Sequence, residues 1–335
     1  MKKILLIPLL LIIMSGCQSK PEITELNYFN FDTSISIKIY DDINQRDIKS
    51  VDQQVTELLE RLENTYSPSI ESSTVNQINN RQNVEVTEEF INVLSKSIEA
   101  CQTSGYKYDP SSGALIDLWS INNENNLPKP EQIDAARTSV GCQEVSIEQN
   151  KVVMPEGYQL DFGSSIKGYA GDQIALILQE AGVENALINL GGNIQAVGNK
   201  YGNPFQLGII RPEIDNDFNE NVLQMPLEDQ AMVTSGINQR FFVSDDVIYH
   251  HIIDATTGYP ANNNLASVTI ITESGMDADI LSTMIFLLGL DQGYEFITNL
   301  EGVEAIFITQ DKKIYQTTDL GIELLDDSYQ IVSYE

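Results

Sequence analysis

Hydrophobic positions alternate in some parts of the chain and recur every three or four residues in others. Residues 34–40 alternate, with Ile35, Ile37 and Ile39 on one face, which predicts a half-buried strand. Helical spacing predicts helices at 51–62, 88–101 (behind an N-cap at Thr87), 130–137 and 276–289. Further strands are expected at 145–154, 186–190, 205–211, 231–236 and 267–272, with hairpins at 240–253 and 305–318. Because helices and hairpins are interspersed, the sequence predicts an α+β fold rather than a doubly wound sheet.

The stretch from 160 to 198 organises the rest of the chain. We expect a strand end carrying Asp161, a turn at 163–165, and an amphipathic helix that Gly182 closes. A strand at 186–190 then runs into Gly191-Gly192-Asn193. Free N–H groups at such a helix start suit a phosphate, but the carboxylate of Asp161 would repel one, so it is expected to hold a hydroxyl or ring N–H. An ordinary βαβ-type crossover is the alternative interpretation. Neither GxGxxG nor GxxxxGKS occurs, which excludes a Rossmann or P-loop assignment.

The first residues have the pattern of a bacterial lipoprotein signal. Lys2 and Lys3 precede an apolar run at 4–13, and Met14-Ser15-Gly16 leads into Cys17. We expect a signal peptide at 1–16, a lipidated Cys17, a tether at 17–27 and one folded domain at 28–335. The protein would then be exported and anchored to a bacterial membrane, facing the periplasm or the outer surface. A plain signal peptide or a single membrane helix is the alternative, although the apolar run is short for a span.

Two further cysteines, Cys101 and Cys142, would form an even pair in an oxidising compartment. A disulfide between them would close a loop of about 42 residues and stabilise the fold by roughly 4 kcal/mol. Two buried thiols are the alternative, and the sequence leaves the choice open.

The charge of the chain limits its ligands. The net charge is −30, and loss of Lys2 and Lys3 with the signal makes it −32. Such a chain repels nucleic acid and anionic lipid. An anionic ligand must therefore be held by local dipoles or by a divalent cation.

Candidate chemistry gathers on two segments. His250 and His251 are the chain's two histidines, and neighbours on a strand point to opposite faces, so a His-rich zinc centre is excluded. A serine hydrolase is disfavoured because no GxSxG elbow occurs. On the helix at 276–289, Asp279 and Thr283 share one face and Ser282 lies beside them. These oxygens suit Mg²⁺, whereas N-terminal capping by Asp277 or Asp279 is the alternative.

Five ordered motifs carry a family resemblance: DFGSSIKGYAGD, INLGGNI, TSG, HIIDATTGYP and DADILSTMIFLLG. Their order and spacing resemble the ApbE family of FAD:protein FMN transferases over nearly the whole mature chain. The resemblance implies mixed and antiparallel sheets with helices, and a ligand cleft between two interlocked lobes. It also implies a reaction in which FAD binds with Mg²⁺, FMN is attached through its phosphate to a Thr or Ser of a partner protein, and AMP leaves. Typical partners are subunits of the Na⁺-translocating NADH:quinone reductase or of Rnf-type complexes.

The resemblance also implies roles for particular residues. His251 matches the histidine that helps to deprotonate the acceptor hydroxyl. The residues expected at the metal are Ser164, Asp279, Ser282 and Thr283. The residues expected at FAD are Phe31, Tyr66, Lys107, Tyr108, Asp109, Asp161, Lys167 and Ile253. The three aromatic residues among them have a plain core interpretation as the alternative. Asp32 stands where the family has glycine, which predicts an ordinary backbone there and adds negative charge.

Two other functions fit the same chain. A periplasmic FAD pyrophosphatase would use the same site with water as the nucleophile. A non-catalytic flavin-binding or solute-binding lipoprotein would share the anchor and the size, but solute-binding proteins are doubly wound and need no helix with a polar start such as 276–289.

Overall fold

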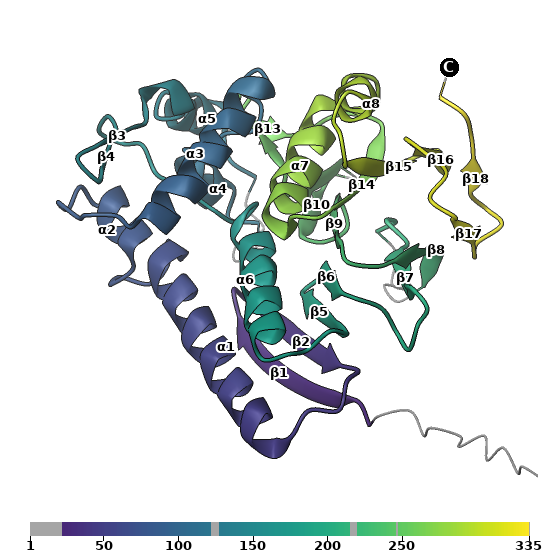
Figure 1. Cartoon of the computed structure of the whole chain (residues 1–335). Helices are drawn as coiled ribbons and strands as arrows, with labels where there is room; N and C mark the ends of the chain where they lie inside the picture. Colours follow the sequence, from purple (N-terminus) through teal and green to yellow (C-terminus); the bar gives the residue numbers. More distant parts are fainter. Residues whose placement is uncertain (1–21, 122–126, 215–219, 246, 335) are drawn as a thin grey trace, which may run out of the picture.

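The structure of the chain is a computed structural model, and it describes residues 22–121, 127–214, 220–245 and 247–334 (Figure 1). The expected signal peptide at 1–16, the lipidated Cys17 and the first part of the tether lie outside the described residues. The first strand begins at Thr24, so the last residues assigned to the tether belong to the folded domain. These residues are mostly polar, so their sequence does not predict a strand. In the structure Leu26 and Tyr28 pack against the core, and the alternate residues are exposed.

One large sheet forms the centre of the molecule. Within the described residues it has nine strands in the order β1-β2-β5-β6-β9-β14-β15-β16-β18, antiparallel except for the pair β16 and β18. The strands are β1 (Thr24–Asn30), β2 (Thr33–Ile39), β5 (Ala186–Leu190), β6 (Asn193–Val197), β9 (Ala231–Gly236), β14 (Leu265–Thr272), β15 (Glu304–Thr309), β16 (Lys313–Gln316) and β18 (Gln330–Ile331). The α+β class with mixed and antiparallel sheets is confirmed.

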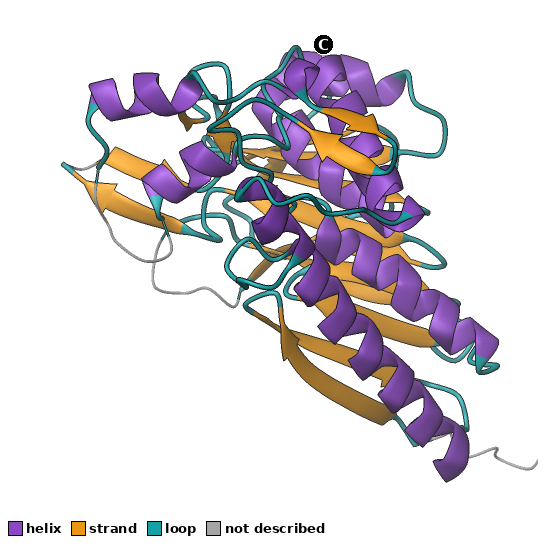
Figure 2. Ribbon diagram, turned by 90° about the vertical axis from the view of Figure 1, so that its left-hand side faces the viewer, coloured by secondary structure: helices purple, strands orange, loops and turns teal. Residues whose placement is uncertain are grey.

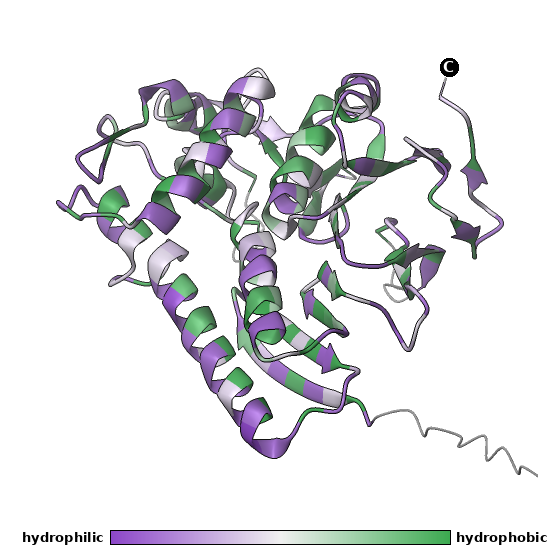
Figure 3. Ribbon diagram, viewed as in Figure 1, coloured by the Kyte–Doolittle hydropathy of each residue, from purple (hydrophilic) through white to green (hydrophobic). Residues whose placement is uncertain are grey.

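Helices cover one face of this sheet, and Figure 2 shows the long helices lying together over the strands. They are α1 (Gln45–Tyr66), α6 (Ile166–Glu180), α7 (Gly275–Leu288) and α8 (Leu290–Thr298). Two further helices, α2 (Thr74–Asn79) and α3 (Glu88–Thr103), pack on α1 and α7 respectively. Helix α1 carries alternating apolar and polar stripes, whereas α7 is hydrophobic over most of its length (Figure 3). A helix buried on nearly all sides can keep its few polar residues only if they have partners.

Smaller units complete the fold. The opposite face of the large sheet packs on a three-stranded sheet, β17-β8-β7, through a second apolar cluster. A third cluster surrounds Trp119, whose indole N–H donates a hydrogen bond to the Gly258 carbonyl at 2.8 Å. The remaining elements are β7 (Phe205–Ile210), β8 (Asn221–Leu227), β17 (Glu323–Leu324), α4 (Gly113–Trp119), α5 (Pro130–Arg137), η1 (Cys142–Glu144), β3 (Ser146–Glu148), β4 (Lys151–Val153), β10 (Phe241–Ser244), β11 (Val247–His250), β12 (Ile253–Asp254) and β13 (Tyr259–Pro260).

Two backbone expectations were wrong. Asp161 does not end a strand. The Asn79 side chain forms hydrogen bonds with both the N–H and the carbonyl of Leu160, and the N–H of Asp161 donates to the Pro110 carbonyl. Helix α6 therefore follows a loop, and no βαβ crossover forms. Asp32 does not have an ordinary backbone: its φ is 55° and that of Phe31 is 54°, so these residues form the two-residue turn of the β1–β2 hairpin. Aspartate tolerates this left-handed conformation better than most residues with a side chain.

A disulfide joins Cys101 to Cys142, with 6.5 Å between their Cα atoms, and this settles the choice that the sequence left open. It ties the end of α3 to η1. The carboxylate of Asp109 accepts hydrogen bonds from the N–H groups of Cys142 and Ser111, both at 2.8 Å. The two sulfurs lie close enough to Asp109 to suggest a metal site, but they are bonded to each other and so are unavailable as ligands. Among the described helices, none is both long and apolar enough to span a bilayer.

Candidate active site

Two helix starts meet at the centre of the candidate site. Figure 1 shows one end of α6 against one end of α7. A Cβ atom at Gly168 would lie 2.0 Å from the Gly275 carbonyl oxygen, and one at Gly275 would lie 2.6 Å from the Gly168 carbonyl oxygen. Any side chain at either position would push the helices apart. The two glycines therefore permit a close approach that brings the polar residues of both helices together.

Carboxylates cross between these two helices. Asp279 of α7 accepts a hydrogen bond from the Gly168 N–H of α6 at 2.9 Å, and its side chain is 4% exposed. Asp172 of α6 accepts hydrogen bonds from the N–H groups of Gly275 and Met276, at 2.6 and 3.0 Å. Asp172 belongs to the first of the five sequence motifs, but its spacing alone indicates no role for it. The alternative interpretation, in which Asp277 or Asp279 caps α7, is wrong, because Ser274 and Asp172 accept the hydrogen bonds of the first N–H groups.

Asp277 has a different partner. Its carboxylate forms an ion pair with Lys96 of α3, with 2.5 Å between Oδ1 and Nζ, and about a third of each side chain is exposed. This contact fastens α7 to α3 and leaves Asp279 as the buried acid of the helix.

Three hydroxyl groups lie beside Asp279. The Ser282 hydroxyl donates to the Asp279 carbonyl at 2.9 Å and lies 2.9 Å from the Ser235 hydroxyl. The Thr283 hydroxyl is 3.1 Å from the same Ser235 oxygen. Sequence reasoning noted the Thr-Ser-Gly motif at the end of β9 but did not assign Ser235 to the site. The signal was present, although only the pairing of β9 with β14 shows that this serine faces α7.

This donor set fits a divalent cation. A carboxylate and hydroxyl oxygens are the hard ligands that Mg²⁺ prefers, and the ion accepts waters and phosphates as further ligands. Within the described residues, Oδ1 of Asp279 has no hydrogen-bond partner. The buried amide oxygen of Gln195 likewise lacks one, and a Cβ at Gly275 would lie 3.1 Å from it. The Gln195 oxygen, which is buried and unsatisfied beside this crossing, indicates a place for a bound ion or water.

The loop before α6 carries a second acid. Asp161 accepts a hydrogen bond from the Gly163 N–H at 2.8 Å, and burial raises the pKa of its carboxyl although Lys167 and Arg240 oppose the rise. Lys167 donates to the Gly163 carbonyl at 3.2 Å. A carboxylate that has lost water without gaining a cation in direct contact can accept a hydrogen bond from a ligand.

Tyr108 lies between the two acids. It accepts a hydrogen bond from the Ser164 hydroxyl at 3.0 Å, and the expected contact of Ser164 with the metal stays a prediction. Burial raises the pKa of Tyr108 to about 12, and the charges of Asp279 and Asp161 add to this rise. Both carboxylates are therefore close enough to act on one phenol, which places the expected metal and FAD residues in one neighbourhood.

The two histidines differ sharply. Nε2 of His250 lies 2.9 Å from the Ala261 carbonyl oxygen, and the ring packs edge-on against Phe286 in the core. Nδ1 of His251 lies 3.2 Å from the Arg240 carbonyl oxygen, which assigns the proton of the neutral ring to Nδ1 and leaves Nε2 as the acceptor. The ring is partly exposed, yet protein atoms surround it closely enough for burial to lower its pKa to about 3. Lys167 and Arg240, which act on Asp161, also act on His251.

Other predicted FAD residues lie in structural positions. Tyr66 is 2% exposed and stacks on Phe90, with 5.4 Å between ring centroids, which is the core arrangement named as its alternative. The Lys107 ammonium donates to the Leu287 carbonyl near the end of α7, at 3.1 Å. Ile253 belongs to the apolar cluster around Trp119. The N–H of Phe31 donates to Glu63 from the hairpin turn. Their contacts with FAD stay predictions.

Two hollows of the surface lie away from these residues. One of about 540 Å³ is lined by Arg211, Glu220, Asn221, Leu325, Asp326 and Asp327. Another of about 170 Å³ is lined by Pro212, Glu213, Ile214, Ile237, Ile248, Ala266, Thr309, Gln310, Lys312 and Tyr329. Neither wall contains a predicted site residue, so the expected cleft between two lobes stays a prediction.

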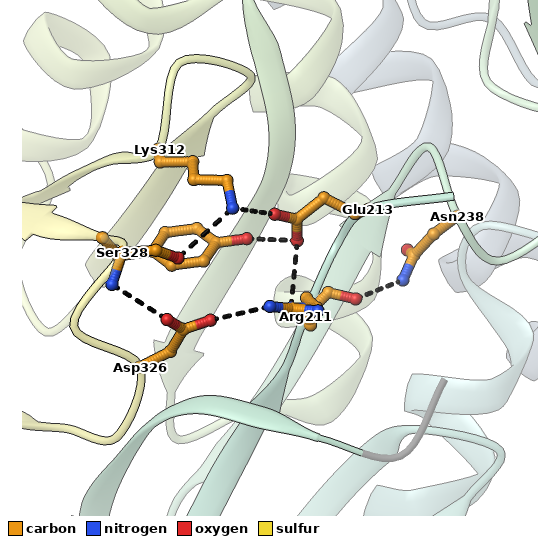
Figure 4. Close-up of polar contacts among 7 residues, drawn as sticks. Arg211, Glu213, Asn238, Lys312, Asp326 and Ser328 are labelled. Atoms are coloured by element: carbon orange, nitrogen blue, oxygen red, sulfur yellow. Dashed lines mark hydrogen bonds and ion pairs between the residues drawn. The ribbon is translucent and has the colours of Figure 1, made fainter. Parts of the chain in front are cut away.

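An ionic network separates these hollows (Figure 4). Lys312 forms an ion pair with Glu213 at 2.8 Å, Arg211 forms one with Asp326 at 3.0 Å, and the Tyr329 hydroxyl donates to Glu213. Burial opposes ionisation of Glu213, but the hydrogen bonds from Lys312 and Tyr329 outweigh it and lower its pKa. The network holds the C-terminal segment against the loop after β7. The charged groups of Arg211, Glu213, Lys312 and Asp326 therefore have a structural role.

Comparison with known proteins connects this arrangement to a family. The sequence profile of the ApbE family matches residues 31–307. The FAD:protein FMN transferase of Treponema pallidum is 30% identical over 303 residues, which cover 84% of this chain and 83% of that protein. The enzyme of the same name from Vibrio cholerae is 30% identical over 292 residues, covering 84% of this chain and 86% of its own.

Solved structures show the same fold. The crystal structure of the ApbE protein from Thermotoga maritima has a TM-score of 0.78 and 31% identity, covering 88% of this chain and 96% of its own. The flavin transferase ApbE from Vibrio cholerae has a TM-score of 0.76 and 26% identity, covering 92% of this chain and 98% of its own.

Proposed function

This chain belongs to the ApbE family, and from that premise we propose that it is a Mg²⁺-dependent FAD:protein FMN transferase. Relatives named FAD:protein FMN transferase match it over most of their length. The observation that carries the proposal is the buried Asp279 carboxylate beside the hydroxyls of Ser235, Ser282 and Thr283. Hard oxygen donors at the meeting of two helix starts suit a diphosphate bound with a divalent cation, which this acidic chain otherwise repels.

The proposed reaction moves FMN from FAD to a Ser or Thr hydroxyl of an acceptor protein. The hydroxyl oxygen forms a bond to the phosphorus of the FMN half, the bond from that phosphorus to the bridging oxygen breaks, and AMP leaves with the bridging oxygen. Nε2 of His251 accepts the hydroxyl proton, because Nδ1 is held at the Arg240 carbonyl. A bound Mg²⁺ would neutralise the pyrophosphate charge, held by Asp279, Thr283 and the neighbouring serine hydroxyls.

FAD is oriented by the loop before α6. The Asp161 carboxylate accepts a hydrogen bond from a ring N–H or hydroxyl of FAD. Its raised pKa favours this role, as does the lack of an ion pair with any residue that the structure describes. Lys167, the second residue of α6, supplies a positive charge beside this loop. Tyr108 and Ser164 hold the space between Asp161 and the metal residues.

Replacement of Asp279 tests this proposal. Asp279→Ala should abolish Mg²⁺-dependent release of AMP from FAD, because the variant loses the carboxylate of the metal site. Excess EDTA should do the same to the wild-type protein. Asp277→Asn is the matched control, since its carboxylate lies two residues away but pairs with Lys96. Unchanged turnover in Asp279→Ala, or in EDTA, would sink the metal assignment.

FAD hydrolysis is the second candidate function, and one observation favours it. His251 is a partly exposed residue, so a water molecule could take the place of the acceptor hydroxyl beside it. Hydrolysis would give AMP and free FMN in the same amounts, with no labelled acceptor. A flavin-binding protein without turnover would give neither product.

The proposed acceptor is a subunit of a membrane redox complex of the Na⁺-translocating NADH:quinone reductase or Rnf type, and the proposed location is the outer side of a bacterial membrane. The Cys17 motif supports an anchor there. The Cys101–Cys142 disulfide supports an oxidising compartment. Cys17→Ser should move the protein from the membrane fraction to the soluble fraction. Retention of that variant in washed membranes would argue against lipidation.

A further inference from the structure

Asp172 holds the start of α7 with both carboxylate oxygens. Oδ1 accepts from the Gly275 N–H at 2.6 Å, and Oδ2 accepts from the Met276 N–H at 3.0 Å and from the Ser274 hydroxyl at 3.2 Å. These N–H groups are the first two of the helix and have no partner within it. A negative charge there is also favoured by the helix dipole.

Helix α7 in turn contributes an acid to the start of α6. Gly168 is the third residue of α6, and its N–H donates to Asp279 of α7. Ser165, which precedes α6, provides no side-chain cap. Each helix therefore satisfies its free N–H groups with an acid of the other, and a shift of one contact changes the other.

The geometry points to Asp172 as a positioning residue that sets the place and rotation of the Asp279 carboxylate. Asp279 lies about one helical turn beyond Gly275, and an α-helix transmits a shift of its first residues to the next turn. The two helices are in direct backbone contact at Gly168 and Gly275, because a Cβ at either glycine would clash with the backbone of the other helix. They cannot move closer at this point. Asp172 thus fixes where Asp279, Ser282 and Thr283 stand relative to α6 and Ser235. This inference rests on the proposed function for the identity of the metal.

Asp172 is not itself expected to touch the ion. Among the described residues, the hydrogen bonds of its carboxylate come from Ser274, the N-cap of α7, and from the first two residues of that helix. Burial raises its pKa, while the N–H groups of Met276 and Gly275 oppose the rise. Its effect on Mg²⁺ therefore passes through α7, in the way that residues behind metal ligands tune affinity by roughly 10- to 100-fold.

Titration calorimetry with MgCl₂ on the full protein, together with the Mg²⁺ dependence of AMP release, tests the inference. Asp172→Ala should weaken Mg²⁺ binding at least roughly tenfold and lower kcat. At saturating Mg²⁺ its KM for FAD should be nearly unchanged, because Asp161 and Lys167 stay in place. Asp172→Asn keeps one acceptor oxygen and should lie between Asp172→Ala and the wild type. Asp277→Asn removes a charge from the same helical turn without touching the crossing, and should bind Mg²⁺ like the wild type.

The possible results distinguish a purely structural role of Asp172 from a role in positioning the metal site. Loss of thermal stability in Asp172→Ala with wild-type Mg²⁺ affinity and kcat would show a purely structural residue and overturn the inference. If Asp172→Ala does not fold, the intermediate affinity of Asp172→Asn decides, and wild-type affinity there also overturns it. If the wild type binds Mg²⁺ but never cleaves FAD, the proposed function fails. The Mg²⁺ affinities of the Asp172 variants then still test whether Asp172 positions the metal site. If the wild type binds no Mg²⁺, both fail.

Discussion

His251 shows how one residue acquires its role from its surroundings. The sequence places two histidines side by side, and the structure buries His250 against Phe286 while His251 keeps a partly exposed ring. The Arg240 carbonyl fixes the proton on Nδ1, so Nε2 can accept one. The neighbouring positive charges of Lys167 and Arg240 help to keep the ring neutral.

The lowered pKa of His251 gives a pH prediction. Because the folded pKa is about 3, below the usual 6.5, the ring stays neutral down to pH values far below neutrality. The wild-type rate of acceptor labelling should therefore show no limb from His251 between pH 5 and 8. His251→Ala should lower the rate at every pH in that range, by less than the roughly 10² to 10⁴ typical of a base with a pKa near the working pH, because a ring with so low a pKa is a weak base. A wild-type limb near pH 6.5 that disappears in His251→Ala would contradict the assignment.

Single residues of the site were only partly predictable. Asp279, Ser282 and Thr283 could be found because acid and hydroxyl groups stand out on an apolar helix. Asp172 could not be assigned, since a half-buried acid on an amphipathic helix resembles a surface residue until its partner helix is known. Asp32 was misread because glycine is the usual choice in a left-handed turn, and a short polar side chain can replace it.

At the scale of elements, hydrophobic spacing predicted the long helices and most strands of the large sheet. It failed where polar residues form strands, as in β1, and where a loop holds an extended segment, as at Leu160 and Asp161. In both places the backbone is fixed by contacts with distant residues rather than by local pattern. Element boundaries moved for the same reason, for example at α1, which extends to Gln45 behind its Asn44 cap.

The disulfide gives a prediction at this scale. Cys101 and Cys142 are separated by 41 positions, and their bond ties α3 to η1. The double replacement Cys101→Ser and Cys142→Ser should lower the free energy of unfolding by roughly 4 kcal/mol, because the unfolded chain regains the freedom that the closed loop removes. Urea denaturation of both forms measures the difference. Equal midpoints for the wild type with and without reductant would contradict a disulfide in solution.

At the scale of the whole molecule, the site exists because the sheet brings distant segments together. The hydrogen bond from Gly168 to Asp279 joins residues 111 positions apart, and that between Ser235 and Ser282 joins residues 47 apart. The motifs could be read from the sequence one by one. Their meeting at the crossing of α6 and α7 follows from the strand order β5-β6-β9-β14, which no local pattern encodes.

The most direct measurement is Mg²⁺-dependent turnover of FAD with and without a purified acceptor subunit, read by in-gel flavin fluorescence and by AMP release. We expect a fluorescent acceptor band and an equal amount of AMP, both dependent on Mg²⁺ and both lost in Asp279→Ala. AMP with free FMN and no labelled acceptor would instead establish a hydrolase. Absence of both products with a proven acceptor would contradict the proposed transferase activity.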